Sequence, residues 1–138
     1  MVKVGINGFG RIGRLSFRIG LLKHSGEIEF GAINTSGSMP TASWAHLTNF
    51  DTTYRKFEKE VKAVEFKKPE DATDDDPQIG NFTIDGTSVP VLAQRDPAKI
   101  PWGKYGVDVV IESTGKFITE EDAKKHAVGG AKRVIISA

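Results

Sequence analysis

Residues 2–14, Val-Lys-Val-Gly-Ile-Asn-Gly-Phe-Gly-Arg-Ile-Gly-Arg, decide the fold class of this chain. A short apolar strand, Val2–Ile6, runs into three glycines, Gly8, Gly10 and Gly13, at the spacing Gly-x-Gly-x-x-Gly. A helical pattern follows at once. Strand, glycine turn and helix in this order are typical of a seat for a dinucleotide pyrophosphate.

Each glycine of the turn has a separate physical task. Gly8 permits the tight turn, Gly10 lets the backbone approach the phosphates because it has no Cβ, and Gly13 lets the helix pack closely on the strand. The start of the helix offers unpaired N–H groups and the positive end of its dipole to an anion. The segment therefore predicts nucleotide binding, with a purely structural glycine-rich turn as the alternative.

The composition narrows the class of protein further. The chain has 138 residues, a length that suits one domain with a real core, and a formal net charge of +1 that predicts no nucleic-acid partner. It contains no cysteine, which excludes disulfides, thiolate metal sites and a cysteine nucleophile within these residues. We expect no metal site and no membrane span. A strand beginning at Val2 leaves no room for a signal peptide, so we expect a cytoplasmic protein.

Apolar spacing and turn residues predict alternating strands and helices. The expected helices are Arg11–His24, a short helix carrying Trp44, Ala45 and Leu47 that Ser38 would cap, and one that begins at the capping box Thr119–Asp122 and ends at Val128. The expected strands are Ile28–Asn34, an alternating stretch Arg55–Lys68, a hairpin Phe82–Ile84 and Val89–Leu92 around Asp85-Gly86, and two buried strands Val107–Ile111 and Val134–Ile136. The acidic segment Glu70–Asp76 is expected to be a solvated loop, and His24, His46 and His126 to lie at the surface or the edge of the core.

This alternation predicts an α/β domain with a doubly wound, mostly parallel (Rossmann) sheet and helices on both faces. In the strand order 3-2-1-4-5-6 the first and fourth strands are neighbours, and ligand binds where their connections part. The loop Asn7–Arg11 should therefore face the loop Glu112–Lys116, whose small hydroxylated residues and glycine suit the close approach of a ribose and a flat ring.

Several further motifs point to a family. The chain resembles the glyceraldehyde-3-phosphate dehydrogenases from end to end, through residues 2–14, Ala-Ile-Asn (32–34), Arg-Asp-Pro-Ala-Lys-Ile-Pro-Trp (95–102), Glu-Ser-Thr-Gly (112–115) and Gly-Gly-Ala-Lys-Arg-Val-Ile-Ile-Ser-Ala (129–138). The resemblance is weakest over residues 35–84, where the acidic loop looks like an insertion. Erythrose-4-phosphate dehydrogenases share much of this pattern. The resemblance implies that residues 1–138 are the NAD- or NADP-binding domain of a phosphorylating enzyme of glycolysis, gluconeogenesis or the Calvin cycle.

The resemblance also implies which residues meet the cofactor. The pyrophosphate would lie on the backbone of the Gly8–Gly13 turn, and Ile12 would pack on the nicotinamide. Asn34 would lie beside the adenosine ribose, and the segment at Arg95 would pass the adenine. The full set of implied cofactor-binding residues is Gly8, Gly10, Arg11, Ile12, Gly13, Asn34, Thr35, Arg95, Ser113, Thr114, Gly115 and Phe117. Phe117 also fits a plain core position, and the Arg95 side chain also fits a surface ion pair.

One departure from the family concerns the choice of cofactor. The family usually has Asn-Asp at the end of the second strand, and this chain has Asn34-Thr35. A carboxylate there would bind the ribose hydroxyls and repel a 2′-phosphate. Thr35 is neutral and, with Ser36–Ser38, could offer hydroxyl and backbone donors to that phosphate, so we expect tolerance of NADP. Against this, residues 35–43 contain no arginine or lysine.

A second departure concerns catalysis. The family carries its nucleophilic cysteine in a segment shortly after the strand that ends here at Ala138, so we expect this chain alone to be inactive. The resemblance implies a homotetrameric parent enzyme that needs a catalytic domain absent from this chain. The absent final strands should leave a free sheet edge with exposed apolar surface. A naturally short nucleotide-binding or regulatory module, using the charged strips at Arg55–Lys68 and Glu70–Asp76 as a partner surface, is the alternative.

Overall fold

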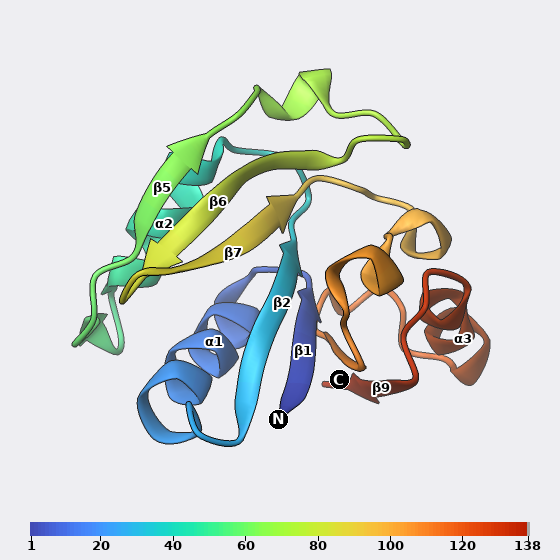
Figure 1. Cartoon of the computed structure of the whole chain (residues 1–138), viewed down its shortest axis with the longest axis horizontal. Helices are drawn as coiled ribbons and strands as arrows, with labels where there is room; N and C mark the ends of the chain where they lie inside the picture. The colour runs from blue at the N-terminus through green and yellow to red at the C-terminus, as the bar shows by residue number, and fades with distance from the viewer. Residues whose placement is uncertain (138) are drawn as a thin grey trace.

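A seven-stranded sheet forms the centre of the molecule (Figure 1). The structure is a computed structural model, and it describes residues 1–137. Its strands lie in the order β5-β6-β7-β2-β1-β8-β9. Their bounds are β1 Val2–Asn7, β2 Ile28–Asn34, β5 Lys62–Glu65, β6 Gln78–Ile84, β7 Thr87–Leu92, β8 Val109–Glu112 and β9 Arg133–Ile136. A separate two-stranded ribbon pairs β3, Phe50–Asp51, with β4, Arg55–Lys56. The last residue of the expected domain, Ala138, lies outside the described residues.

Five of these strands run parallel and carry the doubly wound order. Strands β7, β2, β1, β8 and β9 correspond to positions 3, 2, 1, 4 and 5 of that order, with every neighbouring pair parallel. Strands β5 and β6 extend the β7 edge in antiparallel pairing. The predicted fold class is confirmed, and β1 lies between β2 and β8 as predicted.

Helices cover both faces of the sheet. Helices α1, Arg11–Lys23, and α2, Thr41–Asn49, lie on one side, and α3, Glu120–Val128, lies on the other (Figure 1). Short 3₁₀ turns η2, Pro97–Lys99, and η3, Trp102–Tyr105, accompany α3, while η1, Pro69–Asp71, lies in the acidic segment. No helix among residues 1–137 has the length and apolar character needed to cross a bilayer.

The alternation of side chains along β1 separates two cores. Val4 and Ile6 belong to the larger one, in which the rings of Phe9, Phe17 and Phe82 lie 5.7–6.0 Å apart between the sheet and α1. Gly5 faces the opposite side, where an added Cβ would come within 2.5 Å of the Trp102 ring. Trp102 fills the second core, beneath α3. The missing side chain of Gly5 therefore makes room for the indole.

Two predictions about α2 and the segment that follows it were wrong. Ser38 does not cap α2, because Pro40 holds an extended backbone and the helix begins at Thr41. Arg55–Lys68 is not one alternating stretch but holds two short strands, because β4 pairs with β3 in the ribbon whereas β5 pairs with β6 in the main sheet. The chain reverses between β3 and β4, where Arg55 lies in the left-handed region (φ 62°). The Arg18 guanidinium holds that reversal by donating to the Arg55 carbonyl oxygen at 2.8 Å.

The strand at Val134–Ile136 is not buried as predicted. It forms β9 at the edge of the sheet, pairs only with β8, and leaves Ile135 57% exposed. This exposure agrees with the expected free edge. Strand β8 starts two residues later than predicted, at Val109, and includes Glu112. The hairpin at Asp85-Gly86 and the Thr119 cap of α3, whose Oγ1 accepts from the N–H of Asp122 at 3.1 Å, are confirmed.

The end of α3 gives a stability prediction. The Gly129 carbonyl accepts from the N–H of Gly103 at 2.7 Å, and a Cβ on Gly129 would overlap the Ile100 carbonyl. Gly129→Ala is therefore expected to lower the free energy of unfolding by about 2–3 kcal/mol in urea denaturation. The control is Gly26→Ala, where a Cβ meets nothing within 4 Å, and it should change stability by less than about 1 kcal/mol. Equal effects of the two substitutions would contradict this packing.

Candidate dinucleotide-binding site

A cleft of about 490 Å³ opens at the carboxyl ends of β1, β2 and β8. Eight of the twelve sequence-predicted residues line it, namely Gly8, Gly10, Asn34, Thr35, Arg95, Ser113, Thr114 and Phe117. Of the remaining four, Arg11, Ile12 and Gly13 form the first turn of α1, and Gly115 lies in the loop after β8. The sheet topology thus brings all of the predicted segments to one edge.

The glycine turn has the geometry that a phosphate cradle requires. Gly8 has φ 93°, and a Cβ on it would come within 2.7 Å of Thr114. A Cβ on Gly13 would overlap the Gly8 carbonyl oxygen, whereas one on Gly10 would meet nothing within 4 Å. Helix α1 has no side-chain cap and no acidic residue in its first turn. These residues therefore fit an anion at the start of α1.

The two loops predicted to meet are joined by hydrogen bonds. The Ser113 hydroxyl donates to the Gly8 carbonyl oxygen at 2.7 Å, and the Ser113 N–H donates to the Asn7 carbonyl oxygen at 2.9 Å. Because Ser113 follows β8 and Gly8 follows β1, these bonds fix the floor of the cleft where the two connections part.

The side-chain amide of Asn34 is buried and hydrogen-bonded to other residues of the protein. Its Nδ2 donates to Asn7 Oδ1 at 2.8 Å and to the Gln94 carbonyl oxygen at 2.7 Å, and its Oδ1 accepts from the Gln94 N–H at 2.9 Å. Asn34 therefore ties the ends of β1 and β2 to the segment after β7. Its amide holds the shape of the cleft at the end of β2.

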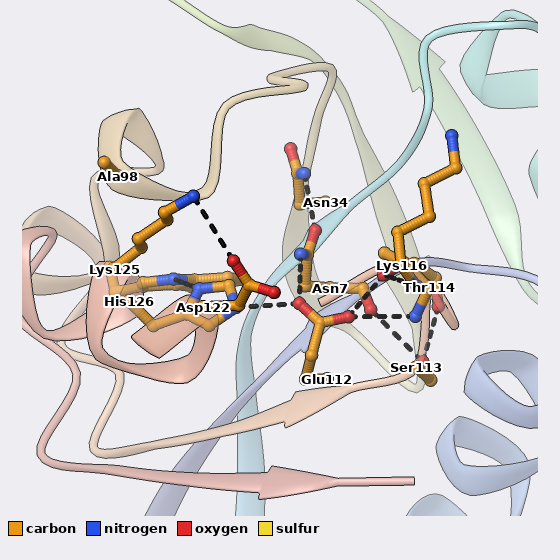
Figure 2. Close-up of polar contacts among 12 residues, drawn as sticks. Asn7, Asn34, Ala98, Glu112, Ser113, Thr114, Lys116, Asp122, Lys125 and His126 are labelled. Atoms are coloured by element: carbon orange, nitrogen blue, oxygen red, sulfur yellow. Dashed lines mark hydrogen bonds and ion pairs between the residues drawn. The ribbon is translucent and has the colours of Figure 1, made fainter. Parts of the chain in front are cut away.

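Glu112, to which the sequence analysis gave no separate role, organises the opposite end of the cleft (Figure 2). Its carboxylate is 1% exposed and accepts four hydrogen bonds. Oε1 accepts from Asn7 Nδ2 at 2.6 Å and His126 Nε2 at 2.8 Å, and Oε2 accepts from the N–H and hydroxyl of Thr114 at 2.9 and 2.6 Å. Burial alone would raise the pKa of Glu112, but hydrogen bonds from His126, Thr114 and Asn7 outweigh it and lower the pKa below its usual value.

His126 contradicts the expectation that the histidines lie at the surface or the edge of the core. It is fully buried, and its Nδ1 accepts from the indole Nε1 of Trp102 at 3.0 Å. An indole N–H can only donate, so the imidazole proton resides on Nε2 and points at Glu112. The partners come from η3, α3 and β8, far apart in sequence, and no short motif marks them.

The hydroxyl of Thr35 is not free to bind a phosphate, which corrects part of the sequence interpretation. Thr35 is 2% exposed, and its Oγ1 donates to the Leu92 carbonyl oxygen at 2.9 Å while accepting from the Gly37 N–H at 3.2 Å. The neighbouring Ser36 and Ser38 do line the cleft. Thr35 therefore shapes the loop rather than offering a donor.

The predicted residue Arg95 brings a cation to the cleft at the end of β2. Arg95 Nε donates to the Ser36 carbonyl oxygen at 3.1 Å, so the guanidinium lies across the loop after β2. The acidic segment lies alongside, because Asp74 accepts from Gln94 Nε2 at 2.9 Å and from Lys99 Nζ at 3.0 Å. These bonds lower the pKa of Asp74. The segment predicted as a solvated loop is thus attached to the cleft.

Comparisons with known proteins agree with this geometry. Residues 2–120 match the family model described as glyceraldehyde 3-phosphate dehydrogenase, NAD binding domain. The chain is 47% identical over 137 residues to a glyceraldehyde-3-phosphate dehydrogenase of Streptomyces coelicolor, and 44% identical over 138 residues to glyceraldehyde-3-phosphate dehydrogenase 1 of Bacillus cereus. These alignments cover 99% and 100% of the chain but only 36% of each relative's length.

The glycine turn generates a paired prediction. Gly13→Ala should lower the free energy of unfolding by about 2–3 kcal/mol, because its Cβ would overlap the backbone of Gly8. Gly10→Ala should change it by less than about 1 kcal/mol, because the added Cβ points into open space. Thermal and urea unfolding of the two variants measure the contrast. A Gly13 variant as stable as wild type would show that the turn is looser than described.

Proposed function

Because the chain belongs to the family of glyceraldehyde 3-phosphate dehydrogenase NAD-binding domains, we propose that its cleft binds NAD with the pyrophosphate on the Gly8–Gly13 turn. The observation that carries this proposal is the uncapped start of α1 beside Gly10, where the absent Cβ leaves open space. Backbone N–H groups and the helix dipole supply the attraction for the phosphates there. The single domain proposed for this role is residues 1–138.

The proposal gives each predicted residue a place along the dinucleotide. Residues of the turn and the first turn of α1 hold the pyrophosphate, namely Gly8, Gly10, Arg11, Ile12 and Gly13, and Ile12, which is half exposed, also offers an apolar surface to the nicotinamide. Asn34, Thr35 and Arg95 form the adenosine end. Ser113, Thr114 and Phe117 line the ribose and nicotinamide end, on the β8 side of β1, and Gly115 belongs to the same loop.

The activity of the whole protein is a further proposal. Bound NAD supplies a hydride acceptor, and the family relation favours a phosphorylating aldehyde dehydrogenase that works as a homotetramer in the cytoplasm. The 138 residues contain no cysteine to serve as the nucleophile for an aldehyde. What these residues do is bind and orient the dinucleotide, and we expect no turnover from this chain alone.

We further propose that the cleft also accepts NADP. The end of β2 carries no carboxylate to repel a 2′-phosphate, since Thr35 stands there. Ser36 and Ser38 line the adenosine end, and Arg95 lies across the same loop. Arginine suits phosphate because its guanidinium presents several donors in one plane. Arg95 thus offers the cation that residues 35–43 lack.

Calorimetric titration with NAD⁺ and NADP⁺ tests both parts. Saturable binding of NAD⁺ is expected, with NADP⁺ within about tenfold of it. Arg95→Ala should weaken NADP⁺ about tenfold, as expected when one charged hydrogen bond is lost, and NAD⁺ less than threefold. Lys59→Ala removes an equal charge beside Asp85, outside the residues that line the cleft, and should change neither. If neither NAD⁺ nor NADP⁺ binds, the proposed function is overturned. An unchanged NADP⁺ affinity in Arg95→Ala would overturn the role of Arg95.

A further inference from the structure

The cluster around Glu112 carries a net negative charge in the interior. Among residues 1–137 only His126 lies within ion-pair distance of the carboxylate, and its other nitrogen accepts from Trp102. The ring is therefore neutral, and the other donors, from Asn7 and Thr114, are neutral as well. Lys116 lines the cleft, but its side chain points away from Glu112 (Figure 2). One buried anion thus has hydrogen bonds but no compensating cation.

This anion has a defined place relative to the cleft. Glu112 ends β8, on one side of β1, while Asn34 ends β2, on the other side, and is followed by Thr35. In doubly wound domains the end of the second strand meets the adenosine ribose, so the other half of the dinucleotide extends to the β8 side. The oxidised nicotinamide ring is a cation and the reduced ring is neutral. A fixed negative charge at this end therefore distinguishes the two redox forms.

We propose that Glu112, held ionised by Asn7, Thr114 and His126, makes the site favour the oxidised cofactor over the reduced one. The inference rests on the proposed binding of NAD. Glu112 is buried, so it acts on the cofactor through its electric field and not by direct contact. Its repulsion of the pyrophosphate is common to both redox forms, so the effect lies in the ratio of their affinities. A buried charge is screened little by salt, which preserves the preference at physiological ionic strength.

Trp102 and His126 are positioning residues for this charge. The indole fixes the imidazole proton on Nε2, where it is donated to Glu112, and so keeps the histidine from carrying the positive charge that would cancel the carboxylate. Glu112→Gln removes the charge but turns an N–H₂ group toward donors. In the double variant Glu112→Gln, Trp102→Phe, the histidine can move its proton to Nδ1 and accept from the new amide. This restores the hydrogen bond to His126 without the charge, while the bond from Asn7 Nδ2 is lost.

The test measures dissociation constants of NAD⁺, NADH and ADP-ribose for four proteins: wild type, Trp102→Phe, Glu112→Gln and the double variant. ADP-ribose lacks the nicotinamide and reports on the adenosine and pyrophosphate contacts alone. Circular dichroism and thermal unfolding establish which variants are folded. If Glu112→Gln alone does not fold, the double variant still measures the effect of removing the charge. Its matched control is Trp102→Phe, which alters the same core and retains the carboxylate.

The ratio of the NAD⁺ affinity to the NADH affinity is expected to fall roughly three- to tenfold in each variant that lacks the Glu112 charge. This is the size of effect expected from one unit charge acting on another in a partly solvated site. It should stay unchanged in Trp102→Phe at pH 8, and the affinity for ADP-ribose should not follow the ratio. An NAD⁺/NADH ratio equal in the double variant and Trp102→Phe would overturn the inference. Failure of wild type to bind any of the three ligands would instead overturn the proposed function.

Discussion

The burial of the Glu112 carboxylate is the constraint on which the arrangement of the cleft depends. An ionised group in the interior is costly unless every lone pair meets a donor, and here the donors come from β1, from the loop after β8 and from α3. Satisfying one charge therefore holds three segments together. The same bonds position Thr114 against Gly8, where only a glycine fits. The glycine turn is therefore connected to the Glu112 carboxylate through Thr114.

The two ends of the cleft are built by different means. At the β8 end a charged, fully bonded cluster is sealed beneath the surface. At the β2 end the bonds run mostly through backbone groups, with Asn34 and Gln94 exchanging hydrogen bonds and Arg95 lying across the loop in solvent. The first end is closed by buried hydrogen bonds, while the second presents exposed polar groups, which we propose determine the ribose substituent that is accepted. The attached acidic segment adds a wall there, through Asp74.

The sequence predicted what local rules govern and missed what tertiary contacts decide. Glycine spacing, apolar runs and the Asp85-Gly86 turn fix strands and turns through short-range sterics, so the strand order and the meeting of the loops at Gly8 and Ser113 followed from them. The burial of His126 depends on Trp102, which is distant in sequence and marked by no pattern. The exposure of Ile135 depends on what covers an edge strand. Thr35 lines the cleft, but its hydroxyl is not free as predicted, because its partner Leu92 lies on another strand.

The most direct test of the account is the map of backbone amides that respond to the cofactor. A titration of the ¹⁵N-labelled chain with NAD⁺, followed by NMR, should move the amides of residues 10–13 first, because we propose that the pyrophosphate binds at the start of α1. Thr114 should follow through its contact with Gly8, and Asp85, on the β6–β7 turn outside the cleft lining, should stay still. Saturable shifts centred away from the glycine turn would contradict the central claim that this turn, held by the Glu112 cluster, is the dinucleotide site.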